Sequence, residues 1–594
     1  GAEYGGEVRC VVRIRTVKRQ GDGFSYAITS QAQQQIYDNH DFDPSWSVLD
    51  LNYRTGGWDI IGKLVYYNQH SYQISDKMSG NTFVKMPDGS VKHNLMEGPF
   101  AFIGHNSGIS GDLGLNWQIN ENHSLGMKMN YGGMLFGNQD IVFEDNVYAN
   151  DELIDIVHST SHTTTPSSHT FTGNIYYDGN INKLHVNFNA DFSDSGYKKE
   201  TSVNESSQND PAFIENLSDG VARMGAGKLV LSYPIWKGMF KIGTEETYVS
   251  AKQEYNSTKT EIPSSKAKIA ENNISGFAEY ALPFKYVQVV AGIRYEHVNF
   301  EYTNECSPKD NISRTHNNWF PSFNASTKIG PVGINLGYTT KIKRPRYDQL
   351  STELQYNNRF LYQTGDPTLL NEIQNTLSLN ANWRWLTLTG AYEVVDNAIY
   401  QLGYPYDDDC TAMVKYSNAK ETVRKLNIYL NASPTIGIWN PRYTVGMEKQ
   451  YFETTVIDPR ESTGTRVVKR NDPMFFVQAN NSFKLKQGWL IDLDYQYTSP
   501  FDYVMYKFTK PKHGLNLAVS KSFLKHDALN VRLAWNDILN KTKEHVCTDY
   551  GNFIHNQNND YYSPSIQLRL SYRFNTANSK YKGTGAGADA KSRM

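Results

Sequence analysis

The 594-residue chain lacks the long apolar run that a membrane-spanning helix requires. Such a helix needs about 20 consecutive apolar residues, whereas the mean hydropathy here is −0.58 and no run approaches that length. A helical membrane protein is therefore excluded. A transmembrane β-barrel is not excluded, because only every second residue of its strands must be apolar.

The chain also lacks a strong charge of either sign, and it has few cysteines. With 59 basic and 61 acidic residues its net charge is −2, which gives no reason to expect nucleic acid as a partner. The 4 cysteines are Cys10, Cys306, Cys410 and Cys547. The last three lie in long links, so one disulfide among them would suit an oxidising compartment, with its pairing left open. No Cys/His spacing typical of a metal site is present.

What the sequence does have is a strand of alternating apolar and polar residues, repeated from about residue 23 to residue 574. Successive side chains of a strand point to opposite faces, so one face of each repeat suits lipid and the other suits water. We interpret the last repeat as a membrane-insertion strand. Its apolar face is formed by Ile566, Leu568, Leu570, Tyr572 and Phe574, and its polar face by Gln567, Arg569, Ser571 and Arg573.

The links between these strands alternate in length. Tight turns rich in Gly, Asn, Asp and Pro, as at 55–57 and 120–123, alternate with long polar links, as at 72–99, 137–167 and 345–373. The strands number about 22, an even number as single-chain bacterial barrels require. This regularity favours an all-β fold, a transmembrane antiparallel β-barrel with short periplasmic turns and long extracellular loops, over a soluble sandwich.

Three regions follow from this interpretation. Residues 1–20 contain a strand-like stretch before the barrel, and residues 21–575 form the barrel itself. Residues 576–594 are rich in Gly, Ala and Lys without an apolar period, so we expect a periplasmic C-terminal tail that is flexible or docked on a neighbour. No signal peptide is visible, and we expect a mature or truncated chain.

Two motifs resemble the TonB-dependent receptor-like outer-membrane β-barrel family of Bacteroidetes. The tail at 580–587 resembles the ending of that group, and the first motif resembles its RPxYxxL…GNPxLxPE passage, departing from it at Asp366 and Asn371. The residues that match the first motif are Arg344, Pro345, Tyr347, Leu350, Gly365, Pro367, Leu369 and Glu372.

Residues 1–16 resemble the last strand of the family's plug domain, so most of the plug and the TonB box are expected to be missing from this chain. A barrel of this width is ordinarily plugged. Either the plug lies upstream of Gly1, which we favour, or another element blocks the lumen.

Several side chains are candidates for binding. His158 and His162 are weak metal candidates, because imidazoles four residues apart on a helix could share a metal, although their Ser- and Thr-rich surroundings favour solvated loop histidines. Asp407–Asp409 could bind calcium, but a solvated loop tip is favoured. Arg344 and Arg346 could form a basic rim that binds lipopolysaccharide phosphates or steers anionic substrates, but the resemblance favours a structural role in the family motif. Lumen-facing candidates for contacts with a plug or a solute are Asp50, Arg384, Asp492, Asp494, Arg569 and Arg573.

The resemblance implies a transporter of the bacterial cell outer membrane, taking up a scarce solute that its extracellular loops capture. One alternative is a non-transporting barrel that serves as a structural or accessory subunit of an outer-membrane or surface-protein assembly complex. Another is a surface-anchored adhesin or binding protein that uses the long loops. Expected partners are outer-membrane lipid and lipopolysaccharide, with TonB acting through the absent N-terminal segment, or other outer-membrane or surface lipoprotein subunits. No catalytic motif is present, so we expect neither an enzyme nor a cofactor. No motif selects the solute.

Overall fold

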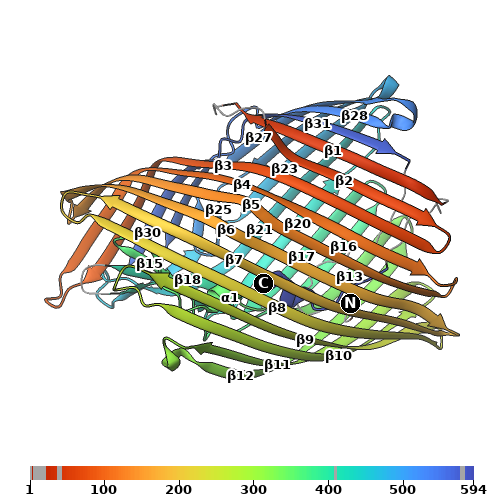
Figure 1. Ribbon diagram of the computed structural model, residues 1–594, viewed down its shortest axis with the longest axis horizontal. Coiled ribbons are helices and arrows are strands. Elements are labelled where there is room, and N and C mark those ends of the chain that lie inside the picture. Colours follow the sequence, from red (N-terminus) through yellow and green to blue (C-terminus); the bar gives the residue numbers. More distant parts are fainter. Residues whose placement is uncertain (1–2, 4–21, 37–42, 407–410, 576–581) are drawn as a thin grey trace.

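In the computed structural model, which describes residues 3, 22–36, 43–406, 411–575 and 582–594, 22 antiparallel strands close into a barrel (Figure 1). Each barrel strand pairs with the next one along the chain, and the last pairs back onto the first, with Phe574 opposite Tyr26. Each predicted strand overlaps one strand of the barrel, although the predicted strands 386–402 and 413–435 also run over β18 (Ile399–Pro405) and β19 (Ala412–Asn418), which lie outside the barrel wall. The predicted fold class is therefore confirmed.

The barrel strands are β1 (Gly23–Gln35), β2 (Asp43–Thr55), β3 (Trp58–Lys85), β4 (Val91–Gln118), β5 (His123–Ala149), β6 (Glu152–Ile181), β7 (Leu184–Ser206), β8 (Ala212–Ile235), β9 (Gly238–Ser257), β10 (Ser265–Pro283), β11 (Val287–Asn304), β12 (Ile312–Ile329), β13 (Val332–Lys343), β16 (Glu372–Trp383), β17 (Leu386–Asp396), β20 (Val423–Ala432), β21 (Trp439–Ile457), β23 (Met474–Lys484), β24 (Trp489–Thr498), β27 (Lys512–Phe523), β28 (Leu529–Asn536) and β31 (Ser565–Phe574).

The outward face of these strands carries large apolar side chains that a soluble protein would bury. On β31, Ile566, Leu570 and Phe574 are 43–45% exposed, and strand alternation places Leu568 and Tyr572 on the same face. The inward face is polar, and across the seam between β1 and β31 the two hydroxyl groups of Thr29 and Ser571 are hydrogen-bonded at 2.6 Å. No helix in the described part of the chain is long and apolar enough to cross a membrane.

Two links that we predicted as loops, 72–99 and 137–167, are mainly strand. β3 and β4 are joined by residues 86–90 alone, and β5 and β6 by residues 150–151. A tilted strand crosses the membrane with about 9–11 residues, whereas β3 to β6 have 27–30 residues each. Beyond the membrane both faces of a strand meet water, so its residues no longer alternate between apolar and polar. The hydrogen bonds between neighbouring strands nevertheless continue. The loop prediction was wrong there because it relied on alternation.

Two other links fold into the barrel instead of outward. One joins β13 to β16 and holds α1 (Tyr347–Leu350), β14 (Gln355–Asn358) and β15 (Leu361–Thr364); the other joins β17 to β20 and holds β18 (Ile399–Pro405) and β19 (Ala412–Asn418). Together they form a four-stranded inner sheet in the order β14-β15-β19-β18. Leu354, Tyr356 and Tyr362 of the first link pack on inward-facing residues of the wall, Val203 and Tyr255. The expectation that the link 345–373 faces the exterior was therefore wrong.

The remaining elements lie in the links and turns of the barrel. The pairing of β29 with β30, and of β30 with the far end of β3, shows that some links also extend the wall. These elements are η1 (Pro308–Asp310), β22 (Thr465–Arg470), η2 (Lys486–Gly488), β25 (Phe501–Tyr503), β26 (Tyr506–Phe508), η3 (Lys525–Asp527), β29 (Glu544–Asp549) and β30 (Phe553–Asp560).

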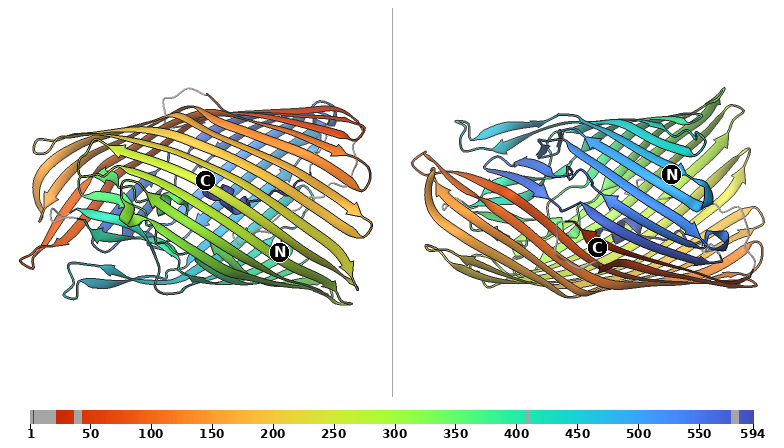
Figure 2. Two further views of the ribbon diagram at one scale, coloured as in Figure 1. Left: turned by 60° about the horizontal axis from the view of Figure 1, so that its bottom comes forward. Right: turned by 90° about the horizontal axis from the view of Figure 1, so that it is seen from above.

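The C-terminal segment, residues 582–594, lies inside the barrel and ends in the short helix α2 (Ala588–Arg593) (Figure 2). Its Lys591 and Arg593 pair with Asp191 and Glu271, whose side chains point inward from β7 and β10. We predicted a periplasmic tail from composition, and the structure places these residues in the lumen because acidic groups of the wall match their charge.

Several predicted features lie outside the described residues. They are Cys10, Cys410, Asp407–Asp409 and the plug-like strand within residues 1–20. Of the described cysteines, Cys306 is exposed and Cys547 half-buried, and both are free thiols.

Candidate functional site

The RPxYxxL motif turns the chain from the barrel wall into the lumen. Pro345 cannot donate to the ladder, and β13 ends just before it. The side chain of Arg344 is 2% exposed and pairs with Glu296 of β11 and with Asp589 of α2. The hypothesis of a lipopolysaccharide-binding rim is therefore wrong for Arg344, since its charge is used inside the barrel. Tyr347 is also buried, in the core next to α2.

The second half of the motif closes the link into a tight loop. The backbone N–H of Gly365 donates to the carbonyl of Ser351 at 3.0 Å, and that of Asp366 donates to the carbonyl of Gln349 at 2.7 Å. A Cβ at Gly365 would lie 2.3 Å from the Gln349 oxygen. Two backbone segments thus meet where only glycine fits.

Asp366, one of the two residues that depart from the family pattern, adds a contact of its own. Its carboxylate accepts hydrogen bonds from the backbone N–H and hydroxyl of Thr368, at 2.8 and 2.6 Å. It also pairs with Lys415 of β19 at 2.9 Å. An asparagine would make the turn but not the ion pair, so this aspartate ties the first folded-in link to the second.

Glu372 and Leu369 complete the motif. Glu372 is buried at the start of β16 and accepts a hydrogen bond from the backbone N–H of Ile399, the first residue of β18, at 3.2 Å. Leu369 is 1% exposed, and Pro367 is buried beside it. The motif residues therefore hold the inner sheet at both of its links.

The far end of the first link is anchored by Arg359. Its guanidinium lies 3.2 Å from Asp155 of β6 and 3.5 Å from Glu205 of β7. Glu205 also accepts a hydrogen bond from the hydroxyl of Tyr356 at 2.9 Å. The link is thus held against the wall at both ends, and the space between becomes a cavity.

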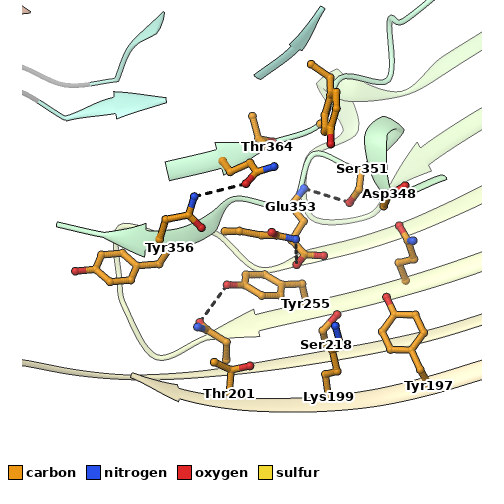
Figure 3. Close-up of a pocket in the computed structure, with 17 residues that line it drawn as sticks. Tyr197, Lys199, Thr201, Ser218, Tyr255, Asp348, Ser351, Glu353, Tyr356 and Thr364 are labelled. Atoms are coloured by element: carbon orange, nitrogen blue, oxygen red, sulfur yellow. Dashed lines mark hydrogen bonds between the residues drawn. The ribbon is translucent and has the colours of Figure 1, made fainter. Parts of the chain in front are cut away.

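This cavity lies between β7, β8 and β9 on one side and the link from β13 to β16 on the other (Figure 3). We call this link the folded-in link. The volume of the cavity is about 520 Å³. We call the cavity the capture pocket. Its lining is rich in tyrosine, amide and hydroxyl groups, and the described residues that line it include no His, Cys or Met. The lining residues are Tyr197, Lys199, Thr201, Asn216, Ser218, Gln253, Tyr255, Asp348, Ser351, Glu353, Gln355, Tyr356, Asn357, Gln363, Thr364, Gly365 and Tyr416.

The charges of the capture pocket nearly cancel. Asp348 pairs with Arg346 at 2.6 Å, and Lys199 faces the opposite side. Glu353 receives a hydrogen bond of 3.3 Å from the amide of Gln355. Burial raises the pKa of Glu353 to about 7, because few groups nearby stabilise its charged form. The pocket therefore presents mainly neutral hydrogen-bond donors and acceptors, together with one carboxyl group, that of Glu353, whose protonation state changes near neutral pH.

The lumen-facing residues predicted from sequence lie elsewhere. Asp492 pairs with Arg532, and its carboxylate accepts a hydrogen bond from Ser482 at 2.6 Å. Asp50, Asp494 and Arg569 follow the inward alternation of β2, β24 and β31, and Arg573 lines a hollow at the short-turn end. None of the six candidates lines the capture pocket.

Arg384 was placed wrongly. It occupies the turn between β16 and β17 with φ +52°, and its guanidinium lies 5.5 Å from the ring centroid of Trp383. The predicted strand ran one residue too far, because the turn takes two residues, 384 and 385, and Arg384 is the first of them.

The two histidines proposed as metal candidates sit on β6, not on a loop or helix. Four residues along a strand span about 13 Å, which is too far for His158 and His162 to share one ion. His162 instead hydrogen-bonds Asp140 at 2.6 Å. No group of three or more His, Cys, Asp or Glu side chains among the described residues is arranged to hold a metal ion.

The residues of the capture pocket share no pattern in the sequence. Glu353, Tyr255 and Tyr416 come from a link, from β9 and from β19, so neither spacing nor alternation connects them. The one available signal was the motif at 344–372, which marks the link that folds inward.

The chain is similar to known outer-membrane barrels in sequence pattern and in fold. The model of the outer membrane protein beta-barrel family matches residues 180–572. A search of the curated proteins finds no match.

Solved structures with the same fold include the copper transporter OprC, at 10% identity and a TM-score of 0.62, covering 94% of this chain and 82% of that one. The chain is also similar to the FrpB iron transporter from Neisseria meningitidis, at 11% identity and a TM-score of 0.58 over 93% and 83% of the two chains. A chain of the FpvAI-pyocin S2 complex aligns at 12% identity and a TM-score of 0.60 over 94% and 74%. At these identities the likeness shows a shared fold.

Proposed function

This chain belongs to the outer membrane protein beta-barrel family and so lies in the bacterial outer membrane, and from that premise we propose that it is an outer-membrane transporter of a scarce solute. The observation that carries the proposal is the capture pocket inside the lumen. Short turns of such barrels face the periplasm. Because the pocket lies near the ends of β7 and β9 that are far from their short turns, it faces the exterior.

The pocket lining favours a neutral, hydroxyl-rich solute such as a short oligosaccharide. Hydroxyl and amide side chains match a ligand that both donates and accepts hydrogen bonds. The partly exposed rings of Tyr197 and Tyr416 offer flat amphipathic surfaces for sugar rings. A copper ion would need soft thioether, thiol or imidazole ligands, and none of the lining residues supplies one.

The resemblance to TonB-dependent receptors supports TonB as the energy source, and the outward apolar face supports contact with outer-membrane lipid. The transporters among the solved structures of this fold favour transport over enzymatic activity. The origin in Bacteroidetes stays a prediction.

The test is uptake of radiolabelled solutes by cells that produce the complete protein in their outer membrane. The panel contains oligosaccharides, ferric chelates and short peptides. We expect saturable accumulation of an oligosaccharide that a protonophore abolishes. Accumulation of ferric chelates alone would contradict the solute class. Accumulation of no solute, together with a stoichiometric co-purified partner, would contradict transport and favour the accessory-subunit hypothesis.

Glu353→Gln should weaken solute binding about 10-fold at pH 8, since a hydrogen bond to a charged group contributes about 1.5–3 kcal/mol. The raised pKa means that Glu353 is ionised above about pH 7 and protonated below it. Binding by the natural protein should therefore weaken as pH falls from 8 to 6, while the variant stays constant. The charged groups that face Glu353 are Lys199 and Asp348. Isothermal titration with the transported oligosaccharide measures the effect.

Glu254→Gln is the matched control, because this neighbouring carboxylate lies on the exposed face of β9 and pairs with Lys266. Its binding curve should follow that of the natural protein at both pH values. If both variants lost the same affinity for the solute, Glu353 would have no specific role in solute binding.

A further inference from the structure

The C-terminal segment follows the inner wall from the short-turn end toward the folded-in link. Lys582 pairs with Asp178 close to the β6–β7 turn, whereas Arg593 reaches Glu271 in the outer half of β10. Figures 1 and 2 show the C-terminus within the outline of the barrel. One short segment thus connects the periplasmic side of the lumen to the base of the capture pocket.

The wall offers a fitted seat for this segment. The backbone N–H of Thr584 donates to the side-chain oxygen of Asn189 at 3.0 Å, and that of Ala586 donates to Asp191 at 3.0 Å. The N–H of Gly587 donates to Glu245 at 2.9 Å. Because side chains of the wall receive these amides, the backbone is satisfied without strand pairing.

Charge and shape also match between the two surfaces. Arg593 donates to both carboxylate oxygens of Glu271, one at 3.1 Å, and both side chains are nearly fully buried. Gly587 has φ +62°, and a Cβ there would lie 2.7 Å from the sulfur of Met224. Ala586 and Ala590 are each 1% exposed. The wall therefore accepts a small-residue segment that carries basic side chains near its end.

The same segment supports the motif that turns the link inward. Asp589 pairs with Arg344, and the guanidinium of Arg593 lies 5.1 Å from the ring centroid of Tyr347. Ala590 packs in one apolar cluster with Leu350. If the segment left, Arg344 would lose an acidic partner and the base of the link would lose its cover.

We propose that residues 582–594 form a releasable latch, seated on the inward face of β7, β9 and β10, that holds the folded-in link and with it the wall of the capture pocket. Release is feasible because side-chain contacts, not ladder hydrogen bonds, hold the latch. The 22-strand ladder would stay intact when the latch leaves. A periplasmic event that displaces the latch would then remove its contacts with the base of the folded-in link, and the wall of the capture pocket would lose that support. The proposal does not depend on transport, because its test measures protection from protease.

The test is limited trypsin digestion of the full chain in detergent, followed by intact-mass spectrometry. Trypsin should reach Lys591 only when the latch has left the lumen. Arg593→Glu places two carboxylates together at Glu271, and losing a buried ion pair should speed cleavage after Lys591 on the order of 100-fold. Cleavage after Arg359, in the folded-in link, should rise with it. The swapped pair Arg593→Glu with Glu271→Arg should restore both protections.

Ser592→Glu is the matched control, because it places the same new carboxylate beside the same cleavage site on the exposed side of α2. It should stay protected. Rapid cleavage after Lys591 in the natural protein, or a swapped pair that stays unprotected, would overturn the latch. Release of the latch with Arg359 still protected would overturn its hold on the link. Heat-modifiable gel migration verifies that every variant retains the barrel.

Discussion

Arg344→Gln should destabilise the lumen of this barrel by about 3–5 kcal/mol, the usual cost of removing one partner from a buried ion pair. Glu296 and Asp589 would both lose a cationic partner in a region where water is largely excluded. Glu296 would retain Arg294. We expect an earlier loss of the heat-modifiable form and faster trypsin cleavage of the folded-in link. Thermal denaturation in detergent, followed by gel migration, measures the first effect.

Arg346→Gln is the control for this prediction. Arg346 belongs to the same motif, but its side chain is 57% exposed and its partner Asp348 is 58% exposed. Exposed pairs contribute only about 0–1 kcal/mol. If both substitutions shifted the denaturation midpoint equally, the buried network would not be the source of the stability. Arg344→Lys should lie between, because an ammonium keeps the charge but loses the planar fork that reaches two acids.

Gly365→Ala should release the folded-in link at a cost of about 3 kcal/mol, at the upper end for overpacking. The added methyl group would lie 2.3 Å from the oxygen of Gln349 and 2.4 Å from that of Ser351. Both are backbone atoms of the same tight loop, so neither can move without breaking the hydrogen bonds at Gly365 and Asp366. Cleavage after Arg359 should accelerate, and the capture pocket should lose its solute affinity.

Gly333→Ala tests whether this effect is local. Gly333 lies in β13, the strand that leads into the link, and a Cβ there would meet nothing within 4 Å. Alanine costs less chain entropy than glycine, so this variant should be neutral or slightly stabilising. Equal proteolysis of the two variants would show that strand β13, and not the glycine contact, controls the link.

The candidate site was only partly predictable. The motif at 344–372 marks the link that folds inward, and strand alternation places Asp492 and Asp494 on the inward face of β24. The capture pocket was not predictable from sequence. Nothing distinguishes Tyr255 from the other tyrosines of the chain, which number 40 in all, before the fold places β14 opposite it. His158 and His162 show the converse error, since their spacing had meaning only on a helix and the structure has a strand.

The sequence by itself determined the barrel. Its strand number, closure and lipid-facing residues follow from alternation, because a membrane requires one apolar face from every strand that crosses it. Only the tertiary structure decided what fills the lumen. The polar links and the C-terminal segment carry no periodic signal. Their direction depends on whether Arg344, Arg359 and Arg593 find acidic partners on strands far away in sequence, and the closed wall alone brings those partners within reach.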